Sequence, residues 1–245
     1  MNNKNIKNLN QVTNGYFNVP IDGNDKADEV WNILFTRNFK DLENTAHSLF
    51  LEGLRELSID DKRVPKLSDL HSKINKKTGW RLKPTDDEYS DSETWFLHLE
   101  QKLFLVTKVI RSKENLDYTP FPEAFHDIFG HLPFLVDERY VNLINKFAIK
   151  YNSLSSQEAK EKFGNFWWYV IEFGLMREGG EIKAFGAGLM SSFGERQNAF
   201  SDKVILRNFD VKEMQNTPIS DHAFHDKLFV MDSLDQVEKA VDDWV

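Results

Sequence analysis

The chain has 245 residues, seven histidines, no cysteine and a formal net charge of -8 at pH 7. Without cysteine, disulfide scaffolds, zinc ribbons and thiol nucleophiles are excluded, and a metal site must use His, Asp and Glu. The acidic balance argues against a nucleic-acid partner. The polar N-terminus lacks the apolar core of a secretion signal, and no apolar run approaches the roughly 18–20 residues that cross a membrane. We therefore expect a cytoplasmic protein.

The chain is expected to form one domain over residues 25–245, preceded by a flexible Asn-rich leader over 1–24. Apolar residues at helical spacing predict a helical region from Asp28 to about Leu57. A short helix is expected from Lys66 to Asn75, ending near Gly79. The polar stretch 83–94 is typical of a loop.

The second half of the chain is also expected to be mostly helical. The predicted helices are 95–111, with strand-like composition at its end, 134–153, the aromatic and buried 163–176, and the amphipathic 233–245. A turn-rich segment is expected over 178–193 and a short strand over 227–230. The sequence thus predicts a mainly α fold, formally α+β, with a few short strands.

Two histidines lie five residues apart in EAFHDIFGHLP, at His126 and His131. Neutral imidazole is the commonest metal ligand in proteins, although two nearby histidines are more often ordinary polar or capping residues. On an α-helix, residues five apart point about 140° away from each other. Gly130 can end a helix, so we expect the helix to end there and His131 to turn back towards His126.

A second pair, His222 and His225, is three residues apart and would share a helix face more readily. Spacing alone favours this pair as a metal site. The surrounding sequence ISDHAFHDK carries no other special residue, so we interpret the pair as part of a solvated turn.

Glu172 is the candidate third ligand, because large apolar residues flank it in FWWYVIEFGL. A buried, ionised carboxylate must be paired with a cation or bound to a metal. A structural ion pair with Arg or Lys is the alternative. Two histidines and one carboxylate on one face of a metal form the arrangement of non-haem Fe(II) sites that activate oxygen.

Three stretches, TPFPEAFHDIFGHLP, VIEFGL and IKAFGAGLMSSFGE, resemble the signature motifs of the pterin-dependent aromatic amino acid hydroxylases, in the style of the bacterial phenylalanine hydroxylases. The similarity extends to TGWRLKP, FLHLEQKLFLVTKVIR and LFVMDSLDQVEKAVDDW, and so covers nearly everything after residue 30. The resemblance implies a single catalytic domain whose helices surround a central iron site. It further implies Fe(II), a tetrahydropterin cosubstrate, O2, a monomeric state and hydroxylation of L-phenylalanine to L-tyrosine.

The resemblance also assigns site residues. It makes His126, His131 and Glu172 the iron ligands and catalytic centre. The substrate-binding positions that it implies are Arg111, which would hold the substrate carboxylate, and Thr119, Pro122, Glu123, Trp168 and Ser191. The cofactor-binding positions that it implies are Trp95, Asp127 and Glu195.

The sequence departs from the family pattern at four places. The segment 85–94 lacks the small apolar stretch that the family places around the pterin, and Glu123 stands where the family usually has Asp. Trp167 and Phe185 each replace a usual Tyr. These departures bear on cofactor affinity and on which ring carbon is hydroxylated.

Other functions compete with phenylalanine hydroxylation. Tyrosine hydroxylation, or attack at another ring carbon, needs the same site. The His126–Asp127 dyad could instead belong to a metal-dependent phosphohydrolase, which would need further His and Asp ligands and basic residues for phosphate. A catalytically silent amino acid binder is the third possibility, and the intact set of candidate iron ligands argues against it.

Overall fold

The computed structural model describes residues 16–18, 24–86, 91–116, 122–219 and 223–244. The α-helices are α1 (Asp25–Thr45), α2 (Ser48–Leu57), α3 (Leu67–Thr78), α4 (Ser92–Glu100), α5 (Glu138–Ser153), α6 (Gln157–Trp167), α7 (Ala187–Ser191), α8 (Phe193–Ala199), α9 (Val211–Met214) and α10 (Leu234–Asp242). Two π-helices, η3 (His126–His131) and η5 (Trp168–Glu172), and two 3-10 helices, η2 (Lys113–Asn115) and η4 (Leu132–Val136), lie between them.

The strands of the described residues form three small sheets. The strands are β1 (Tyr16–Asn18), β2 (Arg81–Thr85), β3 (Leu103–Thr107), β4 (Val109–Arg111), β5 (Leu175–Glu178), β6 (Glu181–Ala184), β7 (Ile205–Asn208) and β8 (Lys227–Met231). β1 pairs antiparallel with β4, and β2 pairs parallel with β3. The largest sheet has the order β6-β5-β8-β7 and mixes parallel and antiparallel pairs. This agrees with a mainly helical fold that carries a few short strands.

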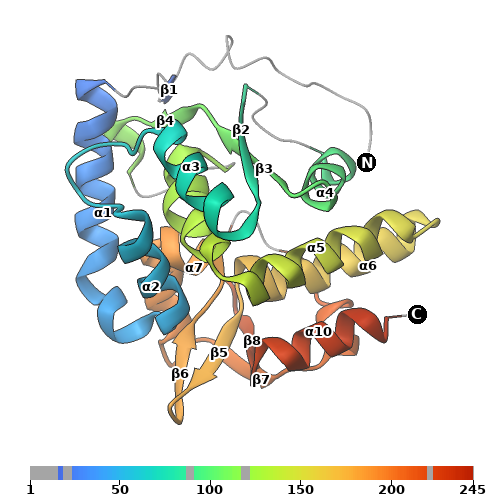
Figure 1. Ribbon diagram of the computed structural model, residues 1–245. Coiled ribbons are helices and arrows are strands. Elements are labelled where there is room, and N and C mark those ends of the chain that lie inside the picture. Colours follow the sequence, from blue (N-terminus) through green and yellow to red (C-terminus); the bar gives the residue numbers. More distant parts are fainter. Residues whose placement is uncertain (1–15, 19–23, 87–90, 117–121, 220–222, 245) are drawn as a thin grey trace.

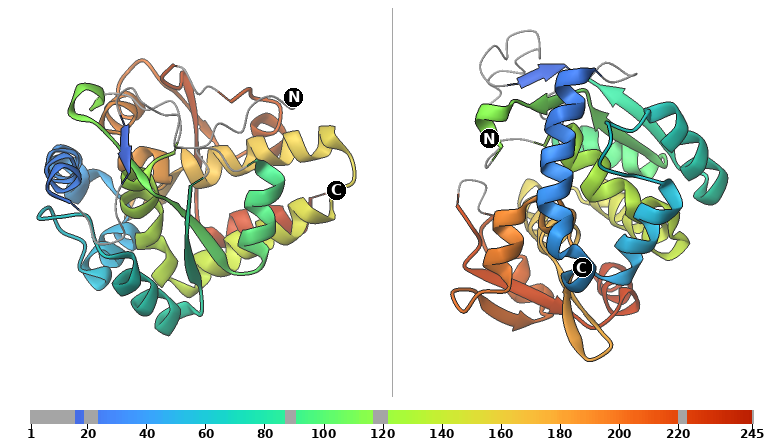
Figure 2. Two further views of the ribbon diagram at one scale, coloured as in Figure 1. Left: turned by 90° about the horizontal axis from the view of Figure 1, so that it is seen from above. Right: turned by 90° about the vertical axis from the view of Figure 1, so that its left-hand side faces the viewer.

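The helices enclose the middle of the molecule. α1 runs along one side, α5 and α6 lie side by side, and the four-stranded sheet and α10 close the opposite end from β1 (Figures 1 and 2). α1 begins where the Asn24 side chain accepts a hydrogen bond from the backbone N–H of Ala27. α7 and η3 lie at the centre of this arrangement (Figure 1).

The main aromatic cluster anchors η3 to α1 and α2. Phe125 and Phe129 stack with ring centroids 4.8 Å apart, and both rings are fully buried. Trp31 of α1 meets Phe125 edge-on at 5.1 Å, and Phe50 of α2 meets Phe129 at 5.6 Å. Each such side chain contributes about 1.5–3 kcal/mol by leaving water. The cluster therefore fixes the segment that carries the two candidate histidine ligands.

Several predicted boundaries are confirmed. The helical region 28–57 is present as α1 and α2, interrupted at 46–47. The short helix ends at Gly79, whose φ of 75° is the left-handed conformation that glycine adopts most easily. The helix predicted within 134–153 and the strand and helix near the C-terminus are present as α5, β8 and α10.

Other boundaries were predicted wrongly. The expected loop over 83–94 contributes its first residues to β2 and its last to α4. The helix expected over 95–111 ends at Glu100, whereas the strand-like character expected at its end is confirmed by β3 and β4. The buried helix expected over 163–176 changes to a π-helix at Trp168 and ends before β5. The turn-rich segment contains β6 and α7.

Most of the predicted leader lies outside the described residues. Its described residues are Tyr16–Asn18, which form β1, and Asn24, which caps α1. Within the described part of the chain, no helix is both long and apolar enough to cross a membrane.

Candidate metal centre

His126 and His131 are the first and last residues of the π-helix η3. The prediction that the helix ends at Gly130 is wrong, because η3 continues through Gly130 to His131. A π-helix forms its hydrogen bonds between residues five apart, so it places residues at this spacing on neighbouring turns. The backbone N–H of Leu132 accordingly bonds to the carbonyl of Asp127. The wider turn brings the two imidazoles to the same side without ending the helix.

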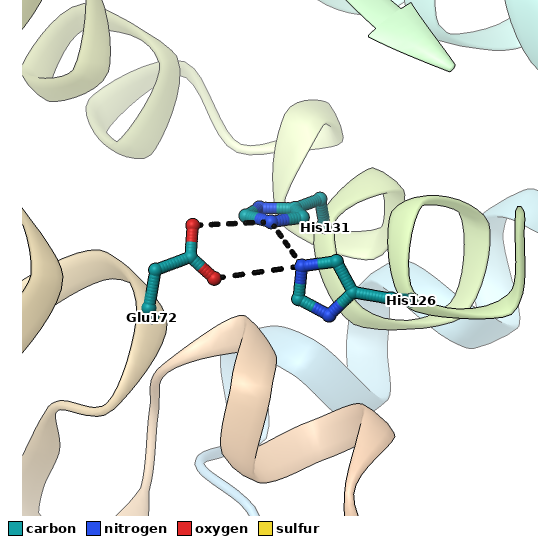
Figure 3. A group of neighbouring side chains, drawn as sticks. All are labelled: His126, His131 and Glu172. Atoms are coloured by element: carbon teal, nitrogen blue, oxygen red, sulfur yellow. Dashed lines mark hydrogen bonds and ion pairs between the residues drawn. The ribbon is translucent and has the colours of Figure 1, made fainter. Parts of the chain in front are cut away.

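Glu172 reaches the two histidines from a second π-helix. It is the last residue of η5, where the N–H of Phe173 bonds to the carbonyl of Trp168 at 2.9 Å. His126 Nε2 lies 3.1 Å from His131 Nε2, and the Glu172 carboxylate oxygens lie 3.5 and 3.3 Å from these two nitrogens (Figure 3). Three potential ligand atoms therefore converge, as Figure 3 shows, and each can face the same point.

A hydrogen-bond chain sets the tautomer of His126. The Ser191 hydroxyl donates to the carbonyl of Ala187 at 3.0 Å, so its oxygen accepts from His126 Nδ1 at 2.8 Å. With the proton on Nδ1, the Nε2 lone pair of His126 faces His131 and Glu172. Such outer hydrogen bonds hold metal-binding imidazoles in place.

The three groups shift one another's pKa values. Burial, followed by the nearby charge of His131, lowers the pKa of His126 to about 4. Burial acts in the same direction on His131, but the Glu172 carboxylate overcomes it and raises the pKa of His131. Burial would raise the pKa of Glu172, but His131 and a hydrogen bond from Trp167 hold it below its ordinary value. The metal-free site therefore holds a proton between His131 and the Glu172 carboxylate.

Close backbone packing joins the two π-helices through the start of α7. A Cβ atom on Gly130 would lie 2.7 Å from the carbonyl oxygen of Ala187. A Cβ atom on Gly186 would lie 2.2 Å from the carbonyl oxygen of Glu172. Only hydrogen in place of a side chain lets these backbones approach so closely.

We expect Gly186→Ala to destabilise the protein by about 1–3 kcal/mol and to weaken metal binding, because the added methyl group must push the Glu172 backbone away. Urea unfolding and metal titration of the purified variant measure both effects. The matched control is Gly164→Ala in α6, where a Cβ meets no atom within 4 Å and alanine should stabilise the helix by up to about 1 kcal/mol. Equal stability and metal affinity in Gly186→Ala and the wild type would contradict this account.

Arg111 lies at the end of β4, close enough to His126 for its charge to act on that imidazole, and is only 6% exposed. Its Nη2 donates to Glu123 Oε1 at 2.9 Å, and Glu123 Oε2 accepts from the Arg111 backbone N–H at 3.3 Å. Nη1 donates to the carbonyl of Leu116, whereas the buried Nε has no hydrogen-bond partner among the described residues. Arg111 and Ser191 line one small pocket. The longer Glu123 thus supports Arg111 where the family usually has Asp.

The family model of the biopterin-dependent aromatic amino acid hydroxylases matches residues 13–245. The chain belongs to this family.

The hydroxylase is similar to curated phenylalanine-4-hydroxylases. It is 33% identical to the enzyme of Mesorhizobium japonicum over 221 residues, which are 89% of this chain and 80% of that protein. It is also 31% identical to the tyrosine 3-monooxygenase of Bos taurus over 173 residues, which are 71% of this chain and 35% of that protein.

Solved structures give the same result. The phenylalanine hydroxylase of Chromobacterium violaceum with bound iron (III) and oxidised 7,8-dihydrobiopterin aligns with a TM-score of 0.86 and 29% identity, covering 94% of this chain and 85% of that one. The Legionella pneumophila phenylalanine hydroxylase aligns with a TM-score of 0.85 and 30% identity, covering 90% and 87%. The predicted family and fold are confirmed.

Two of the three predicted pterin-binding residues, Trp95 and Asp127, lie near β3. Trp95 meets Phe104 edge-on at 5.0 Å, and Phe104 in turn contacts the His131 ring at 5.2 Å. Asp127 accepts a hydrogen bond from the Thr107 N–H at 2.7 Å, and burial raises the pKa of Asp127 to about 6. Phe104 therefore lies between Trp95 and the His131 ring, and Asp127 is anchored to β3.

Trp168 and Glu195 both contact His225, for which the prediction of a solvated turn is wrong. His225 is 3% exposed, so it is not part of a solvated turn. Its Nδ1 lies 2.9 Å from Glu195 Oε1, and the Trp168 indole N–H donates to its Nε2 at 3.0 Å. No local signal could have revealed the burial of His225, because its partners lie 30 and 57 residues away in sequence.

The remaining predicted residues are placed only in part. Pro122 is exposed, and Thr119 and His222 lie outside the described residues.

Proposed function

We propose that this chain is an Fe(II)- and tetrahydropterin-dependent monooxygenase that converts L-phenylalanine to L-tyrosine with O2. The observation that carries the proposal is the group of His126, His131 and Glu172, with their ligand atoms 3.1–3.5 Å apart. It is supported by similarity to phenylalanine-4-hydroxylases along most of the chain, including a structure with bound iron and dihydrobiopterin.

The donor set fits iron. Ligand atoms about 2.1 Å from a metal and at right angles to one another lie about 3 Å apart, close to the separations in this site. Two neutral nitrogens and one carboxylate on a single face leave the opposite positions open, as in non-haem Fe(II) oxygenases. The fixed tautomer of His126 and the lowered pKa of Glu172 keep both groups in the forms that bind a cation.

When bound, the iron and the reduced pterin supply the redox chemistry that activates oxygen, which amino acid side chains cannot supply. His126, His131 and Glu172 would hold the metal and leave its other face accessible. The buried ring of Phe104 packs against the His131 ring and keeps water away from it. Trp168 would form the wall against which the substrate ring lies.

Arg111 would orient the amino acid. Its Nε lies buried without a partner among the described residues, and its Nη1 and Nη2 keep further N–H groups. A substrate carboxylate can accept from two parallel N–H groups of a guanidinium, which fixes its direction as well as its charge. Glu123 Oε1 accepts from the guanidinium and Glu123 Oε2 accepts from the Arg111 backbone N–H, so one carboxylate fixes both the side chain and the backbone of Arg111.

One experiment tests the whole proposal. The chain is loaded with Fe(II) without oxygen, and phenylalanine, a tetrahydropterin and oxygen are then added. We expect mass analysis to show one oxygen atom added to phenylalanine, and chromatography to identify tyrosine. Oxygen uptake without a hydroxylated amino acid would reject the proposal.

The proposed wall predicts a substrate order. We expect kcat/KM to be highest for phenylalanine, lower for tyrosine and lowest for tryptophan, because the rigid Trp168 indole leaves little room for a second indole. Steady-state kinetics with the three amino acids measures the order. A preference for tryptophan would reject Trp168 as the wall.

Metal affinity should depend on pH. Because the pKa of His131 is raised, metal must displace a proton from this imidazole at any pH below that pKa. Affinity should therefore fall about tenfold for each pH unit below that pKa, while His126 takes up its own proton only near pH 4. Calorimetric Co(II) titrations in buffers of different ionisation enthalpy count the proton released. An affinity that is constant between about pH 8 and 6 would contradict this assignment.

The phosphohydrolase reading loses its support. Such a site needs further metal ligands, and no second group of three suitable side chains occurs in the part of the chain that the structure describes. Tyrosine hydroxylation remains the second candidate, favoured by the similarity to tyrosine 3-monooxygenases. The kinetic comparison above separates the two.

A further inference from the structure

His225 is held on every polar edge. Its backbone N–H donates to Glu195 Oε2 at 3.4 Å, and its carbonyl accepts from the Asn198 side chain at 2.7 Å. Its ring packs on Phe173 with centroids 4.1 Å apart and meets Tyr169 edge-on at 5.9 Å. A side chain bound in this way has one orientation, and it can pass that orientation to a neighbour.

The hydrogen bonds define which nitrogen of His225 carries the proton. An indole N–H can only donate, so His225 Nε2 accepts from Trp168 and carries no proton. The proton therefore sits on Nδ1, which donates to the Glu195 carboxylate at 2.9 Å. Glu195 is 8% exposed, so this carboxylate depends on the histidine as a partner. The chain Glu195–His225–Trp168 has one consistent direction.

The chain ends on the indole of Trp168. Trp168 is the first residue of η5 and Glu172 the last, so the same π-turn carries the proposed substrate wall and a proposed iron ligand. Phe173 packs against Trp168 at 4.9 Å and against His225 at 4.1 Å. The bond from the Trp168 indole N–H to His225 Nε2 favours the one indole orientation that points Nε1 at His225.

We propose that His225 is a positioning residue for catalysis, which holds the Trp168 indole at the angle that admits a phenyl ring and rejects an indole. This inference rests on the proposed function. Glu195 contributes by keeping the Nδ1 proton in place. His225 itself does not touch the substrate, so its effect must pass entirely through the Trp168 N–H.

The test compares two substitutions of His225. His225→Leu removes the acceptor for Trp168, and KM for phenylalanine should rise about tenfold, as expected for one lost buried hydrogen bond. The ratio of kcat/KM for phenylalanine over tryptophan should fall, and less tyrosine should form per pterin oxidised. His225→Gln supplies a carbonyl for Trp168 and an amide N–H for Glu195, so it should restore values near those of the wild type.

A double-mutant cycle with Trp168→Phe separates positioning from a general structural role. Phenylalanine in place of Trp168 keeps a ring but has no N–H, so adding His225→Leu should change neither KM nor the substrate ratio further. Additive effects of the two substitutions would overturn the proposal. So would an unchanged phenylalanine-to-tryptophan ratio in His225→Leu.

A spectroscopic measurement avoids any folding defect in the variants. In the wild-type protein, the 15N–1H signal of the Trp168 indole should exchange slowly with solvent, and His225→Leu should accelerate that exchange. Fast exchange in the wild type would overturn the proposal without any variant. If the wild type makes no tyrosine while its indole N–H is protected, then the proposed function has failed and the hydrogen bond stands.

Discussion

Alanine in place of His126 or Glu172 is expected to abolish both metal binding and hydroxylation. Each residue supplies one of three converging ligand atoms, and the other two cannot hold iron in the same geometry. Loss of an outer hydrogen-bond partner of a metal ligand typically costs about 10–100-fold in affinity, so loss of a ligand itself should exceed about 100-fold. Metal analysis after anaerobic reconstitution, with the hydroxylation assay, measures the effect.

The matched control for this experiment is His98→Ala. His98 is a partly buried histidine in α4 whose Nδ1 bonds to the Thr94 carbonyl. Its variant should bind iron like the wild type. Glu172→Gln keeps the size of the side chain and removes its charge, so it distinguishes loss of a ligand from loss of the fold. One iron per chain in His126→Ala would remove that residue from the site.

Arg111→Lys is expected to lower kcat/KM for phenylalanine, by an amount that corresponds to about 2–4 kcal/mol of added activation free energy. Lysine keeps the charge beside Glu123 but loses the planar pair of N–H groups that would fix the direction of the substrate. A substrate displaced by about 1 Å can cost on the order of 100-fold in rate. Pterin oxidation without hydroxylation should rise, and the iron content should stay unchanged.

Arg177→Lys is the corresponding control. Arg177 on β5 pairs with Asp232 at 3.2 Å, but both side chains are exposed, so the pair contributes little, and neither residue lines the pocket beside Arg111. Its kinetics should match those of the wild type. Normal kcat/KM in Arg111→Lys would place Arg111 outside the substrate site.

Local patterns predicted the parts of the fold that depend on neighbouring residues. The apolar face of α1 packs against the core of the protein, as the helical spacing of its residues predicted; it includes Val30, Trp31, Leu34 and Phe35. Gly79 ends α3 by adopting a left-handed backbone conformation, which depends on the glycine itself and not on distant contacts. The three candidate ligands were assigned through the resemblance of the stretches around them to the family motifs, because spacing alone favoured His222 and His225.

Features that depend on distant contacts could not be predicted. A π-turn is less favourable than an α-turn in isolation, and nothing in the residues around His126 distinguishes the two. It persists because Phe125 and Phe129 are fixed against α1 and α2, and because Gly130 meets α7. His225 is buried only because Glu195 and Trp168 come to it from other elements.

The glycine contacts around α7 have a mechanical consequence. At Gly130 and Gly186, backbone rests directly on backbone, with no side chain between that could rotate to absorb a shift. α7 ends in Ser191, which lines the pocket beside Arg111 and bonds to His126. A displacement imposed on α7 by an occupant of that pocket must therefore be shared by both π-helices. The pocket lined by Arg111 and Ser191 is therefore mechanically coupled to the three candidate metal ligands.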